Sequence, residues 1–255
     1  MEALRPTLVF DLDNTLVECG LYYLNAQAEL IRRQSERTGI KPEIIKDLFT
    51  TIDLQSTKLE RGFSRDRFPR SFSATVAVLD AMRGRDPDFG EMDAMWGIGD
   101  SVFHAPYTPY EGVDGTLQAY KDGGWQLLLC SKGQYEVQKR KIAINGFERF
   151  FDPTEQYITL IKSPEYLQQI IAAKQIDVGN SWYIGDSMRD DIGPALAVGM
   201  KAVEVASGTG KWAYENIEHP PTATITSVSE LGTIIPTIAP GRPEPAVAGE
   251  SRPVT

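Results

Sequence analysis

The sequence predicts an α/β protein with a Rossmann-like, doubly wound and mostly parallel sheet that carries an inserted all-helical domain. From about residue 106 to residue 235, short continuous apolar runs alternate with helical segments, which is typical of parallel strands covered on both faces. Another such run, residues 8–10, lies near the N-terminus. Between these two parts, residues 21–105 have helical spacing and no strand-like alternation. The helical block therefore interrupts one sheet domain.

The core begins with the apolar run 8–10, which follows the turn-prone Arg5-Pro6. After a linker punctuated by proline and glycine at 106–112, the chain resumes the helix and strand alternation. We expect strands at 125–130, 157–161, 182–184, 201–206 and 223–226, and helices at 113–121, 134–144, 164–174, 191–198 and 229–235.

Within the helical block, apolar spacing predicts a helix over 21–37 and a second one that begins at Pro42. Gly62 and Pro69 break the pattern between residues 60 and 72, and helical spacing resumes over 75–82 and 89–103. The predicted organisation is a core domain formed by residues 1–16 and 106–236, a helical cap at 17–105, and a proline-rich disordered tail at 237–255.

Composition excludes several classes of function. The chain of 255 residues has a formal net charge of −9, which argues against general binding of nucleic acids or anionic membranes. Two cysteines and two histidines are too few for a disulfide framework or a structural zinc cluster. With no signal peptide or membrane span in the sequence, we expect a cytoplasmic protein, either a monomer or a homodimer.

Two aspartates, Asp11 and Asp13, follow the first strand directly. Their spacing puts both side chains on one side of an extended backbone, so they can share a site. Two carboxylates at the end of a buried strand need a compensating cation, and Mg²⁺ is the usual partner for oxygen ligands. The alternative is a strand followed by an Asx turn, with both acids solvated.

Polar residues suited to phosphate and Mg²⁺ follow three further strands. Ser131 and Lys132 end the second predicted strand, and Lys162 follows the third. The segment 185–191, GDSMRDD, follows the fourth. Because ligands of open α/β sheets bind at the carboxyl ends of the strands, these groups are expected to meet in one crevice.

Taken together, these motifs resemble those of the haloacid dehalogenase superfamily of hydrolases, in the group with a helical C1-type cap. Residues 11–15, DLDNT, fit the family's DxDxT signature, and 127–131, LLLCS, fit its apolar strand ending in Ser or Thr. Residues 162–164, KSP, resemble its lysine segment, and 185–191 fit its last motif. The four motifs stand in the family order and the match extends over nearly all of residues 1–235.

The resemblance implies roles for these residues. Asp11 would be the nucleophile that becomes an aspartyl phosphate, and Asp13 the general acid and base, with a pKa above that of a metal-bound Asp11. Ser131 would hold a phosphate oxygen, although it could instead cap the following helix. Lys162 would neutralise charge on Asp11, unless it is a solvated loop lysine. We also expect Asn14, Thr15 and Lys132 to contact the substrate.

The resemblance also implies Mg²⁺ as cofactor, held by Asp11, Asp186 and the backbone carbonyl of Asp13. Asp191 and Asp190 compete for the last acidic position; the spacing to Gly199 favours Asp191, with Asp190 capping the helix.

In the cap, Arg61 and Arg65 belong to an arginine cluster with Arg67 and Arg70 that could bind a second anionic group of the substrate or simply be solvated.

The predicted function is a Mg²⁺-dependent phosphatase that hydrolyses a small phosphorylated metabolite through an aspartyl phosphate. In this family, true dehalogenases lack the second acid, so Asp13 favours phosphoryl chemistry. Two alternatives remain open at this stage. One is a phosphomutase of the β-phosphoglucomutase type, which returns the phosphoryl group to a sugar. The other is a non-catalytic ligand-binding protein with the same fold.

Overall fold

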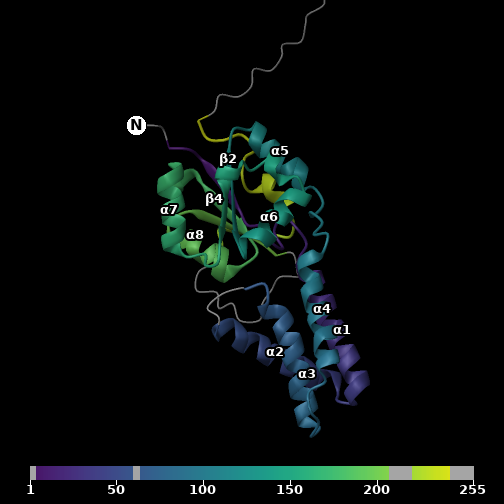
Figure 1. Ribbon diagram of the computed structural model, residues 1–255. Coiled ribbons are helices and arrows are strands. Elements are labelled where there is room, and N and C mark those ends of the chain that lie inside the picture. The colour runs from purple at the N-terminus through teal and green to yellow at the C-terminus, as the bar shows by residue number, and fades with distance from the viewer. Residues whose placement is uncertain (1–3, 60–63, 207–219, 242–255) are drawn as a thin grey trace, which may run out of the picture.

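The computed structural model describes residues 4–59, 64–206 and 220–241 of the chain (Figure 1). Its core is a six-stranded sheet in the order β3-β2-β1-β4-β5-β6, and every pair of neighbouring strands is parallel. The predicted α/β class with a doubly wound parallel sheet is therefore confirmed. The strands are β1 (Thr7–Phe10), β2 (Gln126–Lys132), β3 (Gln156–Thr159), β4 (Trp182–Gly185), β5 (Lys201–Val205) and β6 (Ala223–Ile225).

Consecutive residues of the central strands point into two separate apolar layers, as the pleat requires. Leu8 and Phe10 of β1 pack in one layer, whereas Val9 between them packs in the other. The first layer contains apolar residues of α5 and α6, and the second contains residues of α7 and α8. Figure 1 shows these two pairs of helices on opposite sides of the sheet. The core helices are α5 (Val113–Asp122), α6 (Tyr135–Ile144), α7 (Pro164–Lys174) and α8 (Gly193–Ala197).

Four helices occupy the chain between β1 and β2 and extend away from the sheet layers (Figure 1). They have their own apolar cluster, in which Leu30, Phe49, Phe72 and Met95 are almost fully buried. We refer to them as the helical insertion. It consists of α1 (Gly20–Thr38), α2 (Pro42–Leu59), α3 (Arg67–Met82) and α4 (Phe89–Ser101). No helix in the described part of the chain has the length and apolar character that crossing a bilayer requires.

Three boundaries differ from the sequence prediction. Helix α3 begins at Arg67 because Pro69 lies in its first turn, where a missing N–H costs no helical hydrogen bond. Strand β3 stops at Thr159, and Leu160 and Ile161, which we expected to belong to it, are exposed. The helix expected over 191–198 is a π-helical turn, Met188–Ile192, followed by the short α8.

The last described residues also differ from the expectation. The helix predicted at 229–235 is a 3₁₀ helix, Val228–Thr233. Residues 237–241 fall in the predicted tail, yet Ala239 is buried in the core and its N–H donates to the carbonyl of Gly123. The remainder of that tail, 242–255, lies outside the described residues.

Gly123 gives a direct test of this C-terminal packing. A Cβ at this position would lie 1.8 Å from the carbonyl oxygen of Thr237, so Gly123→Ala should displace the segment and lower the melting temperature. Gly115→Ala is the matched control, because a Cβ there meets nothing within 4 Å. It lies in α5 and should leave stability unchanged or raise it by up to about 1 kcal/mol. Thermal unfolding followed by circular dichroism measures both, and equal melting temperatures would contradict the packing.

Candidate active site

The carboxyl ends of β1, β2 and β4 meet at the point where the strand order reverses, because β1 lies between β2 and β4. A cavity of about 340 Å³ lies here between the core and the helical insertion. Its volume is at the lower end of the range for small-molecule sites. Core residues that line it include Asp11, Asp13, Asn14, Lys132, Lys162, Asp186, Asp190 and Asp191. Residues of the insertion that line it include Tyr23, Leu24, Leu54, Arg67, Phe68 and, next to these helices, Arg65 and Phe103.

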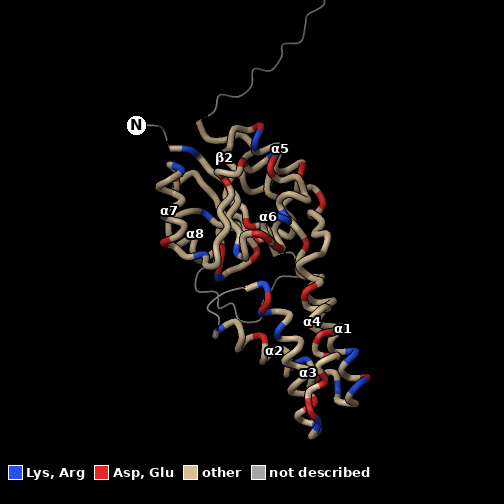
Figure 2. The backbone as a smooth tube through the Cα atoms, viewed as in Figure 1, with Lys and Arg blue, Asp and Glu red and all other residues tan. Residues whose placement is uncertain are grey.

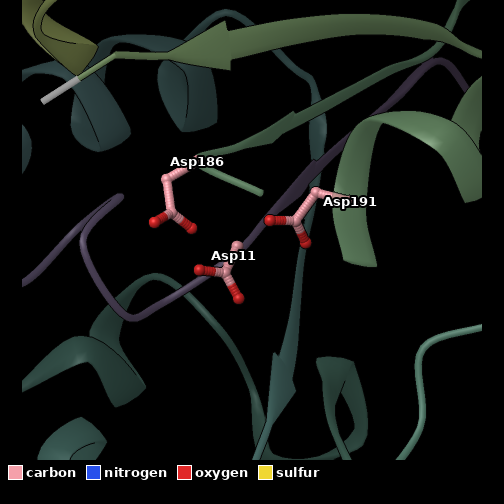
Figure 3. A group of neighbouring side chains, drawn as sticks. All are labelled: Asp11, Asp186 and Asp191. Atoms are coloured by element: carbon pink, nitrogen blue, oxygen red, sulfur yellow. The ribbon is translucent and has the colours of Figure 1, made fainter. Parts of the chain in front are cut away.

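Lys162 lies at the centre of the charged residues. Its ammonium group donates to Asp11 and, at 2.6 Å, to Asp191. All three side chains are almost completely buried. The alternative of a solvated loop lysine is therefore wrong for Lys162. Asp186 completes the group: oxygen atoms of Asp11, Asp186 and Asp191 lie within 4.8 Å of one another, and Figure 3 shows the three carboxylates pointing toward a common point.

The pKa values of Asp11 and Asp186 indicate an excess of negative charge around Lys162. Burial, together with the nearby Asp191 and Asp13, raises the pKa of Asp11 to about 7, although Lys162 acts in the opposite direction. Burial and the neighbouring acids Asp11 and Asp191 also raise the pKa of Asp186. Burial alone would lower the pKa of Lys162, but the charges of Asp11 and Asp191 raise it, so the lysine stays protonated. One ammonium group therefore does not compensate all three acids.

Gly185, the last residue of β4, makes room for Asp191. A Cβ on Gly185 would lie 2.4 Å from the Asp191 carboxyl carbon, so no larger residue fits there without moving this acid. The backbone N–H of Ser187 donates to Asp191 at 3.1 Å. The Ser187 hydroxyl accepts from the N–H of Asp190 and caps the π-helical turn, so the expected cap by Asp190 is wrong.

Asp13 lies in a different environment from Asp11. Its two carboxylate oxygens accept hydrogen bonds from Lys141 at 2.8 and 2.7 Å. Gln138 donates to Asp13 at 3.1 Å, and the Cys19 thiol lies 3.3 Å from it. Lys141 is 2% exposed, whereas the Asp13 side chain keeps 30% of its surface exposed. The acid therefore faces the cavity while its partner cation is covered.

These contacts set the pKa of Asp13. Burial would raise it, but the charge and hydrogen bonds of Lys141, with hydrogen bonds from Gln138 and Cys19, outweigh burial and lower it. Burial raises the pKa of Asp11 instead. The expectation that Asp13 has the higher pKa applies to the metal-bound site. In the metal-free protein the order is the reverse, because the charge and hydrogen bonds of Lys141 favour the ionised form of Asp13.

The expected phosphate contacts divide into two groups. Asn14 lines the cavity in a left-handed conformation (φ 59°), and its side-chain oxygen accepts from the N–H groups of Cys19 and Gly20 at the start of α1. Thr15 and Ser131 are fully buried and are not among the described residues that line the cavity. The Ser131 hydroxyl accepts from Gln138 at 2.6 Å. The cap of α6 is Gln134, so Ser131 does not cap this helix.

Lys132 and Asp190 lie at one wall of the cavity and form an ion pair at 2.9 Å. Arg189 makes a second contact with Asp190, also at 2.9 Å. Asp190 is therefore held away from the acids around Lys162, whereas Asp191 belongs to them. Of the two neighbouring acids considered for the last metal ligand, the geometry places Asp191 in the cluster.

The predicted arginine cluster of the insertion is only partly assembled. Arg65 contacts Asp100 at 3.0 Å and His104, and its guanidinium lies over the Phe103 ring. Arg67 is buried in an ion pair with Asp53, and Arg70 is exposed and not among the lining residues. Arg61 lies outside the described residues. Figure 2 shows acidic and basic residues interspersed along α1 and α3 rather than a single positive surface.

Sequence reasoning missed Gln138 and Lys141. They are three residues apart, so both lie on the face of α6 that packs on the core, where Ile142 is also buried. The available signal was the position of two long polar residues on the apolar side of a predicted helix. A buried lysine needs a carboxylate partner, and the acids after β1 were among the candidates already placed near that edge.

Comparison with known proteins finds a matching family and similar folds. The family model of the haloacid dehalogenase-like hydrolases matches residues 6–199 of the chain. A haloacid dehalogenase-like family hydrolase from Xanthomonas campestris is 18% identical, with a TM-score of 0.72 over 90% of this chain and 89% of that one. The Bacillus subtilis HAD-hydrolase YfnB, solved bound to magnesium, is 20% identical, with a TM-score of 0.60 over 92% of this chain and 100% of that one.

A HAD phosphatase from Thermococcus onnurineus is 21% identical, with a TM-score of 0.58 over 92% of this chain and 99% of that one. Structures described as haloacid dehalogenases have similar scores. At these identities the likeness shows the fold alone. No curated protein is significantly similar to the chain.

The raised pKa of Asp11 predicts a pH-dependent stability of the metal-free protein. The folded pKa is about 7 and the ordinary value is 3.8, so folding favours the protonated carboxyl. The unfolded chain gives up this proton at lower pH, so the stability contributed by Asp11 is lost as pH rises from about 4 to about 7. The free energy of unfolding of the wild type should fall over this range relative to Asp11→Asn. Urea unfolding in EDTA measures the difference, and a pH-independent difference would refute the assignment.

Proposed function

Since the chain belongs to the haloacid dehalogenase-like hydrolases, we propose that it is a Mg²⁺-dependent phosphatase of a small phosphorylated metabolite. The observation that carries the proposal is the presence of two differently placed carboxylates, Asp11 and Asp13, in one cavity with Lys162. One can attack phosphorus while the other handles the proton of the leaving group. In this family the second acid of the first motif, here Asp13, separates phosphatases from dehalogenases.

The acidic cluster fits a hard divalent cation. Asp11, Asp186 and Asp191 offer carboxylate oxygens within 4.8 Å of one another, and oxygen ligands of this type suit Mg²⁺. The raised pKa values of Asp11 and Asp186 mark negative charge that Lys162 leaves uncompensated. When bound, Mg²⁺ would supply the remaining positive charge and keep the nucleophile ionised. Asp11 and Asp186 would hold it, with Asp191 shared between the ion and Lys162.

The residues of the chain then divide the reaction between them. An oxygen of Asp11 forms a bond to phosphorus as the bond between phosphorus and the substrate oxygen breaks, which leaves an aspartyl phosphate. Lys162 neutralises charge on Asp11 and on the transferred group. Asp13 gives a proton to the departing oxygen, then accepts one from the water that hydrolyses the intermediate. The negative charge of a bound phosphate ester raises the pKa of a neighbouring carboxyl, which favours the protonated form of Asp13 for the first step.

The rest of the cavity would select the substrate. Tyr23, Phe68 and Phe103 form an aromatic wall on the side of the insertion, with contacts among their rings. Arg65 lies at the same wall, over Phe103. The volume of about 340 Å³ suits a small metabolite with one phosphate group. Among the residues proposed to bind substrate, we retain Asn14, Lys132 and Arg65, which line the cavity.

Replacement of the nucleophile is the first test of the proposal. Asp11→Asn should lower the release of inorganic phosphate from 4-nitrophenyl phosphate by at least about a thousandfold, since no bond to phosphorus can then form. Asp122→Asn, in the exposed last turn of α5, is the control and should keep wild-type activity. Residual activity of Asp11→Asn near the wild-type level would refute the nucleophile.

A panel of phosphorylated metabolites and 2-haloacids then separates the related functions. Free phosphate supports the phosphatase, isomer formation without it indicates a phosphomutase, and halide release indicates a dehalogenase. Turnover of no compound, together with tight binding of one, would support the non-catalytic alternative.

Removal of the metal is the second test. EDTA should abolish phosphate release, and added Mg²⁺ should restore it, because the acids around Lys162 need a further positive charge before Asp11 can approach a phosphate dianion. The Mg²⁺-dependent rise in melting temperature should disappear in Asp186→Asn and persist in Asp190→Asn, since Asp190 is paired with Lys132. Activity that is indifferent to EDTA would remove the metal from the proposal.

A further inference from the structure

We propose that Lys141 is a positioning residue that fixes the carboxylate of Asp13 for proton transfer. The inference rests on the proposed phosphatase function and adds a group to it that the four motifs do not contain. Lys141 acts through Asp13 rather than on the substrate, because its ammonium group is already engaged with both oxygens of that carboxylate.

The contacts around Asp13 fix its orientation. Lys141 contacts both oxygens, at 2.8 and 2.7 Å, and so holds the carboxylate at one place. Contacts to one oxygen alone then limit rotation about the terminal torsion. Gln138 and Cys19 add a contact to one oxygen each. An acid that must meet a leaving oxygen at hydrogen-bond distance gains from this restriction.

Gln138 connects the acid to the phosphate side of the site. The two hydrogens of its side-chain amide are shared among three acceptors: Asp13 at 3.1 Å, the hydroxyl of Ser131 at 2.6 Å and the carbonyl of Lys132 at 3.1 Å. Gln138 and Lys141 project from one face of α6, one turn apart. The end of β2 and the acid after β1 are thus held in register by a single helix.

Residues 106–112, which lead from the helical insertion back to the core, support Lys141 from the other side. The ammonium group lies 4.5 Å from the centre of the Tyr107 ring, and the Tyr107 hydroxyl donates to the carbonyl of Val102. The side-chain amide of Asn145 donates to the carbonyls of Tyr107 and Lys141, both at 2.9 Å. Lys141 is therefore held in one place. A residue that positions another side chain must itself be fixed in this way.

Stability alone is a poor reason for this pair. A buried ion pair loses the hydration of both partners, and apolar residues of similar size often stabilise a protein as well or better. Here the cation is covered while the carboxylate keeps 30% of its side-chain surface exposed to the cavity. The arrangement leaves the acid available to a substrate, while Lys141, which also lines the cavity, is almost covered and has its ammonium group engaged with both oxygens of the acid.

Leaving-group dependence provides the test. Lys141→Met should lower kcat/KM for phenyl phosphate at least about tenfold more than for 4-nitrophenyl phosphate, because 4-nitrophenolate departs without a proton and phenolate needs one. Lys141→Arg, which keeps the charge and two donors, should recover part of this loss. Lys139→Met, on the same helix but bonded to Gln156, should leave the ratio of the two substrates unchanged. Equal losses for both substrates in Lys141→Met would overturn the proposal.

A double-mutant cycle separates positioning from direct substrate binding. If Lys141 acts only through Asp13, adding Lys141→Met to Asp13→Asn should change kcat/KM less than about twofold. A large further rise in KM in the double variant would mean that Lys141 binds substrate itself, and would overturn the proposal. The double variant removes both charges together, so it remains informative if Lys141→Met alone does not fold. Wild-type protein that releases no phosphate from either ester would instead refute the proposed function.

Discussion

The ammonium group of Lys162, buried between Asp11 and Asp191, is the interaction on which the rest of the site depends. Parallel strands deliver their carboxyl ends to one edge, and here that edge gathers three buried or half-buried acids. Like charges in a low-dielectric setting repel strongly, so a cation among these side chains favours their ionised forms where the strands converge. Lys162 comes from the loop after β3, which is separated from β1 by β2. The loop must therefore reach across the end of β2 to complete the site.

Asp11 and Asp13 are only two positions apart in the sequence, yet they lie in two different environments. Asp11 continues the line of β1, accepts from Lys162 and lies with the acids that follow β4. Asp13 has already left the sheet, and it meets α6 instead. Each acid thus has its own lysine, one from a loop and one from a helix. The division of labour that we propose, between a nucleophile and a proton carrier, would follow from this separation and not from any difference in side-chain chemistry.

The sequence predicted the sheet and the edge of the site well, because these depend on local patterns. Apolar runs, helix spacing and the polar residue after each strand are visible without long-range information. Thr15 and Ser131 were expected to face the substrate, yet both are buried, since a motif identifies residue type but not side-chain direction. Lys141 was missed for a related reason. Its partner Asp13 is 128 positions away, and only the folded packing of α6 brings the two together.

Helix α6 connects the chemistry of the site with the position of the helical insertion. Lys141 and Gln138 hold Asp13, and Arg140, which lies between them in the sequence, donates to the carbonyls of His104 and Ala105 after α4. The segment between β1 and α1 is connected to the site as well. The Asn14 side chain accepts from the N–H of Gly20 at the start of α1 and also bonds Asp186. Both connections between the insertion and the core therefore contact residues that hold Asp13 or Asp186. A shift of the insertion would act on these acids first, so the substrate selection and the proton transfer that we propose depend on the same geometry.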